Sequence, residues 1–380
     1  MKKLLLFFLL IIPLTVSAEE LSLAENAKSA IMIESTTGEV LYSKNPHTKL
    51  APASMTKMMS LIIIMENIEN GNLNWNDTIV VSKTAASMGG SQIYLEPNEL
   101  MSVEDLIKGI CIASGNDATV ALAEKIAGTE KAFVKLMNDK AKILGLKNTN
   151  FINSTGLDAE NHYSSAYDMS LIAKELVKHE KILEFSNIYE DYLRQNTSNS
   201  FWLVNTNKLV KFYSYIDGLK TGYTTDAGYC LTATGKKKGM RLITVVMGEN
   251  TIDNRSKDTI AMMDYGFNMY SLNTLIKKND LVGNTTVKLG EYEKVNLLST
   301  DNITSLNNTL KKEKNITYKI KTNKLIAPIF KGNIAGEILV YIDNVYKYSV
   351  DIIVDKDIKK ANIIKLFLRN IKDIITGNIN

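Results

Sequence analysis

Cysteine and histidine are scarce in this chain. Its 380 residues include two cysteines, Cys111 and Cys230, and three histidines, His47, His162 and His179. Both cysteines lie in apolar stretches, which does not suit a disulfide-stapled scaffold, although a single bond between them stays open at this level. The histidines show no metal-ligand spacing, which argues against zinc hydrolysis. We therefore expect neither a metal nor another cofactor.

A large excess of charge of one sign is also absent. The chain has a formal net charge of +4, and residues 356–380 alone hold six Lys/Arg against two Asp. The remaining chain is close to balance, which argues against nucleic-acid binding because that function needs a basic face on a folded domain. The basic end instead predicts contact with an anionic surface.

Long apolar runs are missing except at the start, MKKLLLFFLLIIPLTVSAEE. Two lysines, an apolar run and a small-residue exit at Ala18 are typical of a secretory signal peptide over residues 1–18. The run is too short for a comfortable membrane span. We expect cleavage after Ala18 and export to the outer face of a bacterial cytoplasmic membrane, in the cell-wall space.

The last segment, residues 356–380, has an apolar stripe bordered by lysines and an arginine. The stripe consists of Ile364, Phe367, Leu368, Ile371, Ile374 and Ile375. This pattern predicts an amphipathic helix that lies in a membrane interface and anchors the protein there. The alternative is an ordinary terminal helix that packs on the protein's own core.

Periodicity predicts an α+β domain over residues 19–273 and a small all-β domain over residues 274–355. In the first domain, strands are expected within 30–42 and an antiparallel meander at 213–221, 228–235 and 241–248. Helices are expected at 55–68, from Ser102 to 113, 117–127, 130–144, 165–178 and 254–270. Short alternating segments separated by Asn, Gly and Lys turns make up the second domain.

Three short motifs occur in a fixed order. Ser54-Met55-Thr56-Lys57 is the one S-x-x-K in the chain, Ser114-Gly115-Asn116 follows at a helix exit, and Lys220-Thr221-Gly222 is the one K-T-G. Residues three apart on a helix share a face, so Ser54 and Lys57 can interact. The ordered trio is typical of class A β-lactamases and penicillin-binding proteins.

Each motif residue suits a task in acyl transfer. Ser54 is the candidate nucleophile, and Lys57 can take its proton only if the lysine pKa lies well below its ordinary value of about 10.4. Burial among methionines and the positive field of Lys220 would lower that pKa. Ser114 could relay a proton to the leaving amine, and the Asn116 amide could hold Lys57 and the substrate backbone.

The third motif is expected to bind the substrate. Lys220 and Thr221 would meet a carboxylate, and Gly222 would let an extended peptide lie along its strand. The backbone N–H groups of Ser54 and Tyr223 are candidates for the oxyanion hole. Arg255 is a further candidate carboxylate contact, with a surface helix arginine as the alternative.

With these motifs the sequence resembles the low-molecular-mass penicillin-binding proteins, specifically the serine-type D-alanyl-D-alanine carboxypeptidases of peptidase family S11. GLDAENHYSSAYDMSLIAKEL (156–176), DGLKTGYTTDAGYCLTATGKKKGMRLITVVMG (217–248) and the helix that contains Arg255 also resemble that family. The resemblance implies a transpeptidase-like domain with a five-stranded antiparallel sheet flanked by helices. It also implies removal of the terminal D-Ala from peptidoglycan stem pentapeptides through an acyl-enzyme on Ser54, and acylation of that serine by penicillins.

One residue departs from the family pattern, because Tyr223 follows K-T-G where members commonly have His. Three alternatives stay open. A D,D-endopeptidase would use the same site on cross-bridges, and a class A β-lactamase would need an E-x-x-x-N box that is not found between residues 150 and 195. A non-hydrolytic wall-binding scaffold would have a degenerate site, whereas every motif residue is present here.

Overall fold

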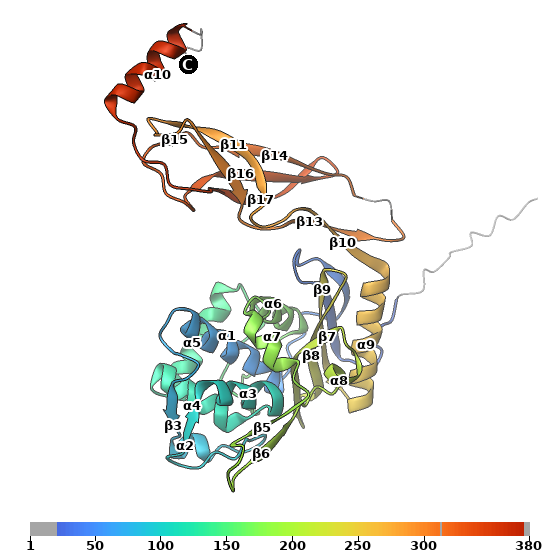
Figure 1. Cartoon of the computed structure of the whole chain (residues 1–380). Coiled ribbons are helices and arrows are strands. Elements are labelled where there is room, and N and C mark those ends of the chain that lie inside the picture. The colour runs from blue at the N-terminus through green and yellow to red at the C-terminus, as the bar shows by residue number, and fades with distance from the viewer. Residues whose placement is uncertain (1–20, 312–313, 376–380) are drawn as a thin grey trace, which may run out of the picture.

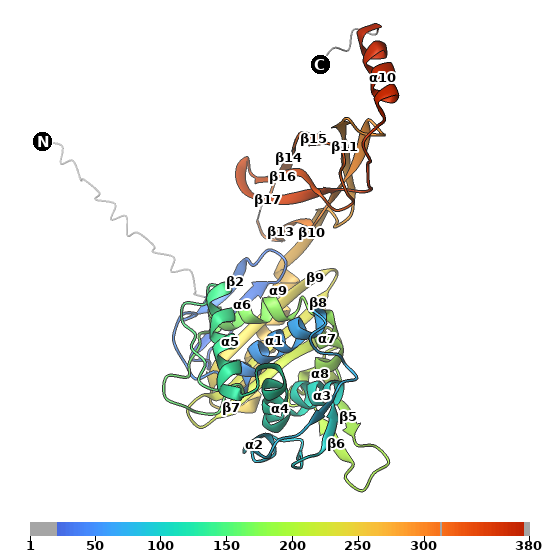
Figure 2. The same cartoon turned by 90° about the vertical axis from the view of Figure 1, so that its left-hand side faces the viewer.

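The structure, a computed structural model, describes residues 21–311 and 314–375. The expected signal peptide lies outside the described residues. The chain forms an N-terminal domain (residues 21–269), a β domain (residues 270–360) and a terminal helix at the far end (Figures 1 and 2). The predicted α+β domain followed by an all-β domain is confirmed.

A five-stranded antiparallel sheet forms the centre of the N-terminal domain, as predicted. Its strands lie in the order β2-β1-β9-β8-β7. Their bounds are β1 Ser29–Glu34, β2 Val40–Lys44, β7 Ile216–Thr224, β8 Gly228–Lys237 and β9 Met240–Glu249. Helices cover both faces, so β1 is buried throughout: Ile31 joins one core and Met32 the other. The sheet is thus the wall between two hydrophobic cores.

Helices on one side of the sheet carry Lys57, Ser114 and Asn116 of the candidate site. They are α1 Lys57–Glu69, α3 Val103–Ala113, α4 Asn116–Ala127, α5 Glu130–Ile143, α6 Ala166–Leu176 and α7 Glu180–Ser186. Ser102 and Ser165 cap α3 and α6 by accepting a backbone N–H three residues ahead. The long helix α9, Ile252–Met269, packs on the other face of the sheet. Each predicted helix is present, whereas α7 was not expected.

Short elements complete the N-terminal domain, and none of them was expected from the periodicity. They are the 3₁₀ helix η1 Ala53–Thr56, β3 Thr78–Val80, α2 Lys83–Ala86, β4 Leu100–Ser102, β5 Glu190–Leu193, β6 Phe201–Val204 and α8 Leu209–Phe212. β5 and β6 form a hairpin that projects from the end of the domain opposite the β domain in both views (Figures 1 and 2).

The β domain has its own apolar core. A six-stranded sheet has the order β14-β16-β17-β12-β11-β15, and β10 pairs with β13 in a separate ribbon. The bounds are β10 Tyr270–Ile276, β11 Leu281–Lys288, β12 Lys294–Ser299, β13 Ile303–Asn308, β14 Ile316–Thr322, β15 Leu325–Ile326, β16 Ile334–Ile342 and β17 Val345–Val354. β10 follows α9 without a loop, and Ile358, beyond the last strand, is fully buried in this core.

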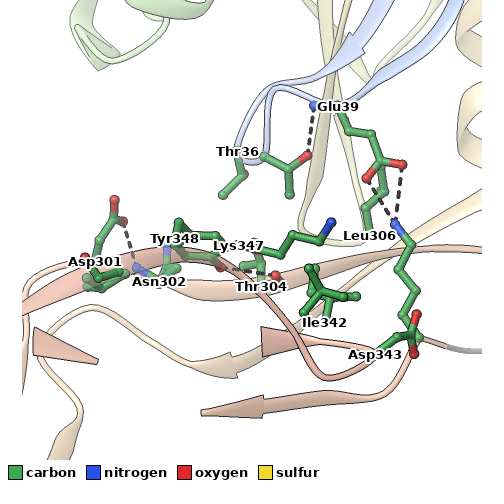
Figure 3. Close-up of a pocket in the computed structure, with 15 residues that line it drawn as sticks. Thr36, Glu39, Asp301, Asn302, Thr304, Leu306, Ile342, Asp343, Lys347 and Tyr348 are labelled. Atoms are coloured by element: carbon green, nitrogen blue, oxygen red, sulfur yellow. Dashed lines mark hydrogen bonds and ion pairs between the residues drawn. The ribbon is translucent and has the colours of Figure 1, made fainter. Parts of the chain in front are cut away.

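The two domains meet at the β10–β13 ribbon. Leu306 of β13 is buried in the core beneath α9, and Lys314 forms an ion pair with Glu39 of the β1–β2 hairpin at 3.1 Å. A cleft of about 860 Å³ lies beside this junction, lined by both domains (Figure 3). The ribbon therefore continues the core of the N-terminal domain into the β domain.

The terminal helix α10, Ile363–Ile375, points away from the β domain (Figure 1). Arg369 ties it to Glu293 at 2.9 Å, whereas Ile363, Ile364 and Phe367 are each more than 60% exposed. Its apolar face thus has no cover from the described part of the chain. Among the described residues, no helix is long and apolar enough to cross a membrane.

Both cysteines are buried and free. The bond between Cys111 and Cys230 that the sequence left open is therefore not formed. Each behaves as a small apolar residue in the core of the N-terminal domain.

The helical core gives a prediction about stability. Phe133 of α5 is fully buried, so Phe133→Ala should lower the free energy of unfolding by about 3–5 kcal/mol. Ile143→Ala, on the same helix and 77% exposed, should change it by less than about 0.5 kcal/mol. Denaturant unfolding followed by far-ultraviolet circular dichroism measures both. Equal effects would mean that α5 does not pack as described.

Candidate active site

Ser54 lies in η1, the 3₁₀ turn that leads into α1. Ala53 before it has a positive φ of 46°, and β7 passes directly beside the turn. A Cβ at Gly222 would lie 2.9 Å from Pro52 O and 3.2 Å from Ser54 N. Gly222 therefore allows β7 to approach the serine backbone closely. This close approach is a reason for the glycine that the sequence did not indicate.

Lys57, one turn after Ser54, has no solvent exposure. Its Nζ donates to Ser54 Oγ at 2.9 Å and to the carbonyl oxygen of Thr155 at 2.7 Å. Burial lowers the pKa of Lys57 well below its ordinary value, and the positive charge of Lys220 lowers it further, while Asp117 opposes the shift. The expected pair of serine and low-pKa lysine is thus assembled at hydrogen-bond distance.

The second acceptor for Lys57 belongs to a loop over residues 153–157. Asn153 Oδ1 accepts hydrogen bonds from the backbone N–H groups of Thr155 and Gly156. Gly156 has φ +88° and touches η1, since a Cβ there would lie 1.8 Å from Ala53 O. The loop therefore orients Lys57 and also packs on the turn that carries Ser54. No role for this loop was predicted from the sequence.

Ser114 ends α3 in the left-handed conformation, at φ 64°. Ser114 Oγ and Asn116 Oδ1 are buried and make no hydrogen bond with the described residues. Asn116 Nδ2 donates to Gly89 O at 2.6 Å, so its partner is this backbone oxygen rather than Lys57. A strained serine and two unsatisfied polar atoms at one place are typical of a functional site.

Asp117 is a buried carboxylate that sequence reasoning missed. It accepts hydrogen bonds from the backbone N–H groups of Ile93 and Leu95. These bonds hold the chain beside the cavity in place. Its neighbour in sequence, Asn116, could have drawn attention to it. Because its negative charge acts against the shift at Lys57, Asp117 also sets how far that lysine pKa falls.

His162 stabilises η1, the turn that contains Ser54. Its Nδ1 accepts the N–H of Ile152 at 3.1 Å, so Nε2 carries the proton and donates to Thr56 Oγ1 at 2.9 Å. Burial lowers the pKa of His162 to about 4. The imidazole is thus neutral at physiological pH and holds Thr56, two residues after the serine.

Lys220 lies in the middle of β7 and is 2% exposed. Its Nζ donates to Thr221 O at 3.1 Å. Burial lowers the pKa of Lys220 to about 7; Cys111 acts in the opposite direction and Arg255 adds to the decrease. Lys220 has no ion pair with a carboxylate among the described residues, so as a buried cation it can bind an anion.

The two residues after Lys220 in the motif differ in exposure. Thr221 is buried, and its Oγ1 donates to Thr206 Oγ1 at 2.8 Å. Tyr223 is 56% exposed and stacks on Tyr229, with ring centroids 4.4 Å apart. The tyrosine found where the family commonly has histidine therefore forms part of the rim of the site.

Arg255 lies in the first turn of α9 and is 6% exposed. Burial lowers its pKa, and its Nε has no hydrogen-bond partner among the described residues. It is therefore not the surface arginine that was the alternative.

A cavity of about 890 Å³ joins most of these residues. Its walls include Ser54, Ser114, Thr221, Gly222, Tyr223 and Arg255. Lys57 reaches the wall through its bond to Ser54, Lys220 precedes Thr221 in β7, and the backbone N–H of Asn116 donates to Ser91, which also lines the cavity. Across residues 21–311 and 314–375, no group of three or more His, Cys, Asp or Glu could hold a metal ion. The cavity can thus combine an activated hydroxyl with two buried cations.

Comparisons with known proteins agree with this chemistry. Residues 15–251 match the D-alanyl-D-alanine carboxypeptidase family, peptidase S11, and residues 270–360 match the C-terminal domain of penicillin-binding protein 5. D-alanyl-D-alanine carboxypeptidase DacF of Bacillus subtilis is 49% identical over 357 residues, which are 92% of this chain and 90% of the relative.

Solved structures agree as well. Penicillin-binding protein 5 of Haemophilus influenzae is 30% identical with a TM-score of 0.70, over 88% of this chain and 98% of that one. Penicillin-binding protein D2 of Listeria monocytogenes, in its ampicillin-bound form, is 30% identical with a TM-score of 0.58, over 64% and 98%. The chain belongs to peptidase family S11 and is a serine-type D-alanyl-D-alanine carboxypeptidase.

Proposed function

We propose that Ser54 is the nucleophile that removes the terminal D-Ala from peptidoglycan stem pentapeptides, with Lys57 as its general base. The observation that carries this assignment is the 2.9 Å hydrogen bond between Lys57 Nζ and Ser54 Oγ, in a place where burial lowers the lysine pKa. A neutral lysine accepts the serine proton as Oγ attacks the peptide carbonyl. The acyl-enzyme is then hydrolysed.

The buried cations bind the terminal carboxylate of the substrate in this proposal. Lys220 provides a charge, Thr221 a hydroxyl, and Arg255 an N–H that has no partner in the described chain. The charge-assisted bonds also compensate the cost of burying cations. A C-terminal D-Ala supplies this free carboxylate, as carboxypeptidase activity requires.

Ser114 passes the proton from Lys57 to the leaving D-Ala, since its Oγ faces the cavity without a hydrogen-bond partner. Asn116 Oδ1, also unsatisfied, accepts an N–H of the bound peptide. The backbone N–H of Ser54 lies beside the close contact at Gly222, and together with the N–H of Tyr223, the next residue of β7, it forms the oxyanion hole.

Penicillins acylate Ser54 in the same cavity. The ampicillin-bound relative from Listeria supports this step, because its fold matches 64% of this chain. The β-lactam carboxylate would occupy the place of the D-Ala carboxylate beside Lys220 and Arg255.

The protein is exported and held at the membrane surface by α10. Support comes from the apolar face of this helix, which is exposed, and from the lysines beside it. An interfacial helix of this kind lies in the plane of the membrane rather than across it.

One prediction of the proposed function concerns the nucleophile. The chain from residue 19 should release D-alanine from diacetyl-Lys-D-Ala-D-Ala, and Ser54→Ala should release none. Lys57→Arg should slow acylation of Ser54 by a fluorescent penicillin about 10²–10⁴-fold, because a guanidinium cannot accept the proton. Labelling of Ser54→Ala at the wild-type rate would refute the assignment.

The second prediction concerns pH. The folded pKa of Lys220 is about 7, so the lysine loses its charge as the pH rises through that value and the substrate carboxylate loses a partner. We expect kcat/KM for the free enzyme to fall above about pH 7, mainly through a higher KM. In Lys220→Arg the charge persists, because an arginine pKa exceeds about 12.

The alkaline decrease should therefore disappear in Lys220→Arg, even if the maximal rate is lower. Thr206→Ser, which keeps the hydroxyl that accepts from Thr221, serves as a control and should retain the alkaline decrease. A profile for Lys220→Arg that still falls near pH 7 would assign the titration to another group.

The third prediction concerns the tail. Removal of residues 363–380 leaves Ile358 in the β-domain core, so the shortened protein should fold and retain D-alanine release from the soluble peptide. It should no longer co-sediment with vesicles of phosphatidylcholine and phosphatidylglycerol, whereas the full mature chain should. Added salt should weaken the binding of the full chain only in part, because apolar contact is not screened. Persistent sedimentation of the shortened form would place the membrane contact elsewhere.

A further inference from the structure

The β5–β6 hairpin carries two aromatic side chains on its outer face. Tyr192 and Trp202 lie directly opposite one another across the two strands and are 48% and 54% exposed. Leu193 and Leu203, which are on the inner face, are buried in the main core. The alternation of a strand thus puts one pair into the protein and presents the aromatic pair to the outside.

The hairpin is held firmly, although it is short. The Arg194 guanidinium binds the Glu99 carboxylate and the carbonyl oxygen of Ile93. At its base, Asn205 Nδ2 donates to the carbonyl oxygens of Ser186 and Ile188. Such contacts fix the aromatic pair in place before any ligand binds, which reduces the entropic cost of binding.

The base of the hairpin is also the wall of the catalytic cavity. β6 leads into Thr206, which lines the cavity and accepts the hydrogen bond of Thr221. Lys211 then lies over the ring of Tyr189, 4.2 Å from its centroid, and Phe212, 70% exposed, lines the cavity. An exposed aromatic residue, Phe212, thus lies at the cavity, and the exposed pair Tyr192 and Trp202 lies on the hairpin.

We propose that this outer face, formed by Tyr192 and Trp202, binds the glycan strand to which the stem peptide is attached. The proposal rests on the proposed function, because a stem peptide in the cavity brings its sugar chain to the rim. β-linked amino sugars present flat C–H faces, which pack on aromatic rings, and hydroxyls, which the Tyr O–H and Trp N–H groups can bind. The hairpin lies at the end of the molecule opposite α10 (Figures 1 and 2).

The test compares two substrates with the full chain from residue 19. One is diacetyl-Lys-D-Ala-D-Ala, and the other is an uncross-linked glycan strand of several disaccharides with pentapeptides attached. For Tyr192→Ala/Trp202→Ala, the kcat/KM for the strand relative to that for the short peptide should fall about five- to tenfold, through KM. Tyr318→Ala, an aromatic residue of the β domain that is 46% exposed, is the matched control and should leave the ratio unchanged.

A second measurement does not depend on catalysis. Glycan strands stripped of their peptides should bind the wild-type chain in a co-sedimentation assay and bind the double variant about five- to tenfold more weakly. If the wild-type chain released no D-alanine, the proposed function would be refuted. The co-sedimentation assay with glycan strands would still test the role of the hairpin. An unchanged ratio with unchanged glycan binding, or an equal loss on both substrates, would overturn the proposal. The proposal would also be overturned if sedimentation velocity showed a dimer for the wild-type chain and for Tyr318→Ala, but a monomer for the double variant.

Discussion

The exclusion of water from Lys57 is the constraint on which the rest of the site depends. An exposed lysine keeps its proton near neutral pH, whereas a fully buried one next to a second cation does not. The helix core around Met55, Met58 and Met59 provides this burial, and the 153–157 loop closes the other side. The close approaches at Gly156 and Gly222 also help to exclude water. At each position the backbone packs directly against η1, whereas a side chain would hold the two segments apart.

The site is rich in cations, and the carboxylate that acts on Lys57, that of Asp117, is occupied by backbone N–H groups. In the unliganded protein burial lowers the pKa of both lysines, and a neighbouring positive charge lowers each further, that of Lys220 for Lys57 and that of Arg255 for Lys220. An anionic substrate relieves the repulsion, so the free energy stored by burying charge is recovered on binding. Burial, the largest cause of the low pKa of Lys57, persists when the carboxylate is bound, so the lysine can act as a base in acylation and again in deacylation.

Much of this arrangement could be predicted from the sequence, because it depends on local patterns. The three motifs identified Ser54, Lys57 and Lys220, and hydrophobic periodicity located the helices and the strand meander. The loop that holds Lys57 could not be found in this way. Thr155 takes part through a backbone carbonyl, which any residue has, and its position depends on Asn153 and on the fold around it. The β5–β6 hairpin was missed for a related reason, since strands of four residues are too short for a clear alternation.

The connection between the domains gives the outer hairpin its importance. α9 passes into β10 without a loop, and Leu306 of the paired strand is buried in the N-terminal core, so the ribbon is not a flexible linker. A membrane bound at the end of the β domain therefore also restricts the position of the far end of the N-terminal domain. If α10 lies on the membrane, the β5–β6 hairpin at the opposite end of the molecule is far from the membrane (Figure 1). A glycan strand at that distance can bind the aromatic face first. Its stem peptide then has to move only the short distance from the rim of the cavity to Ser54.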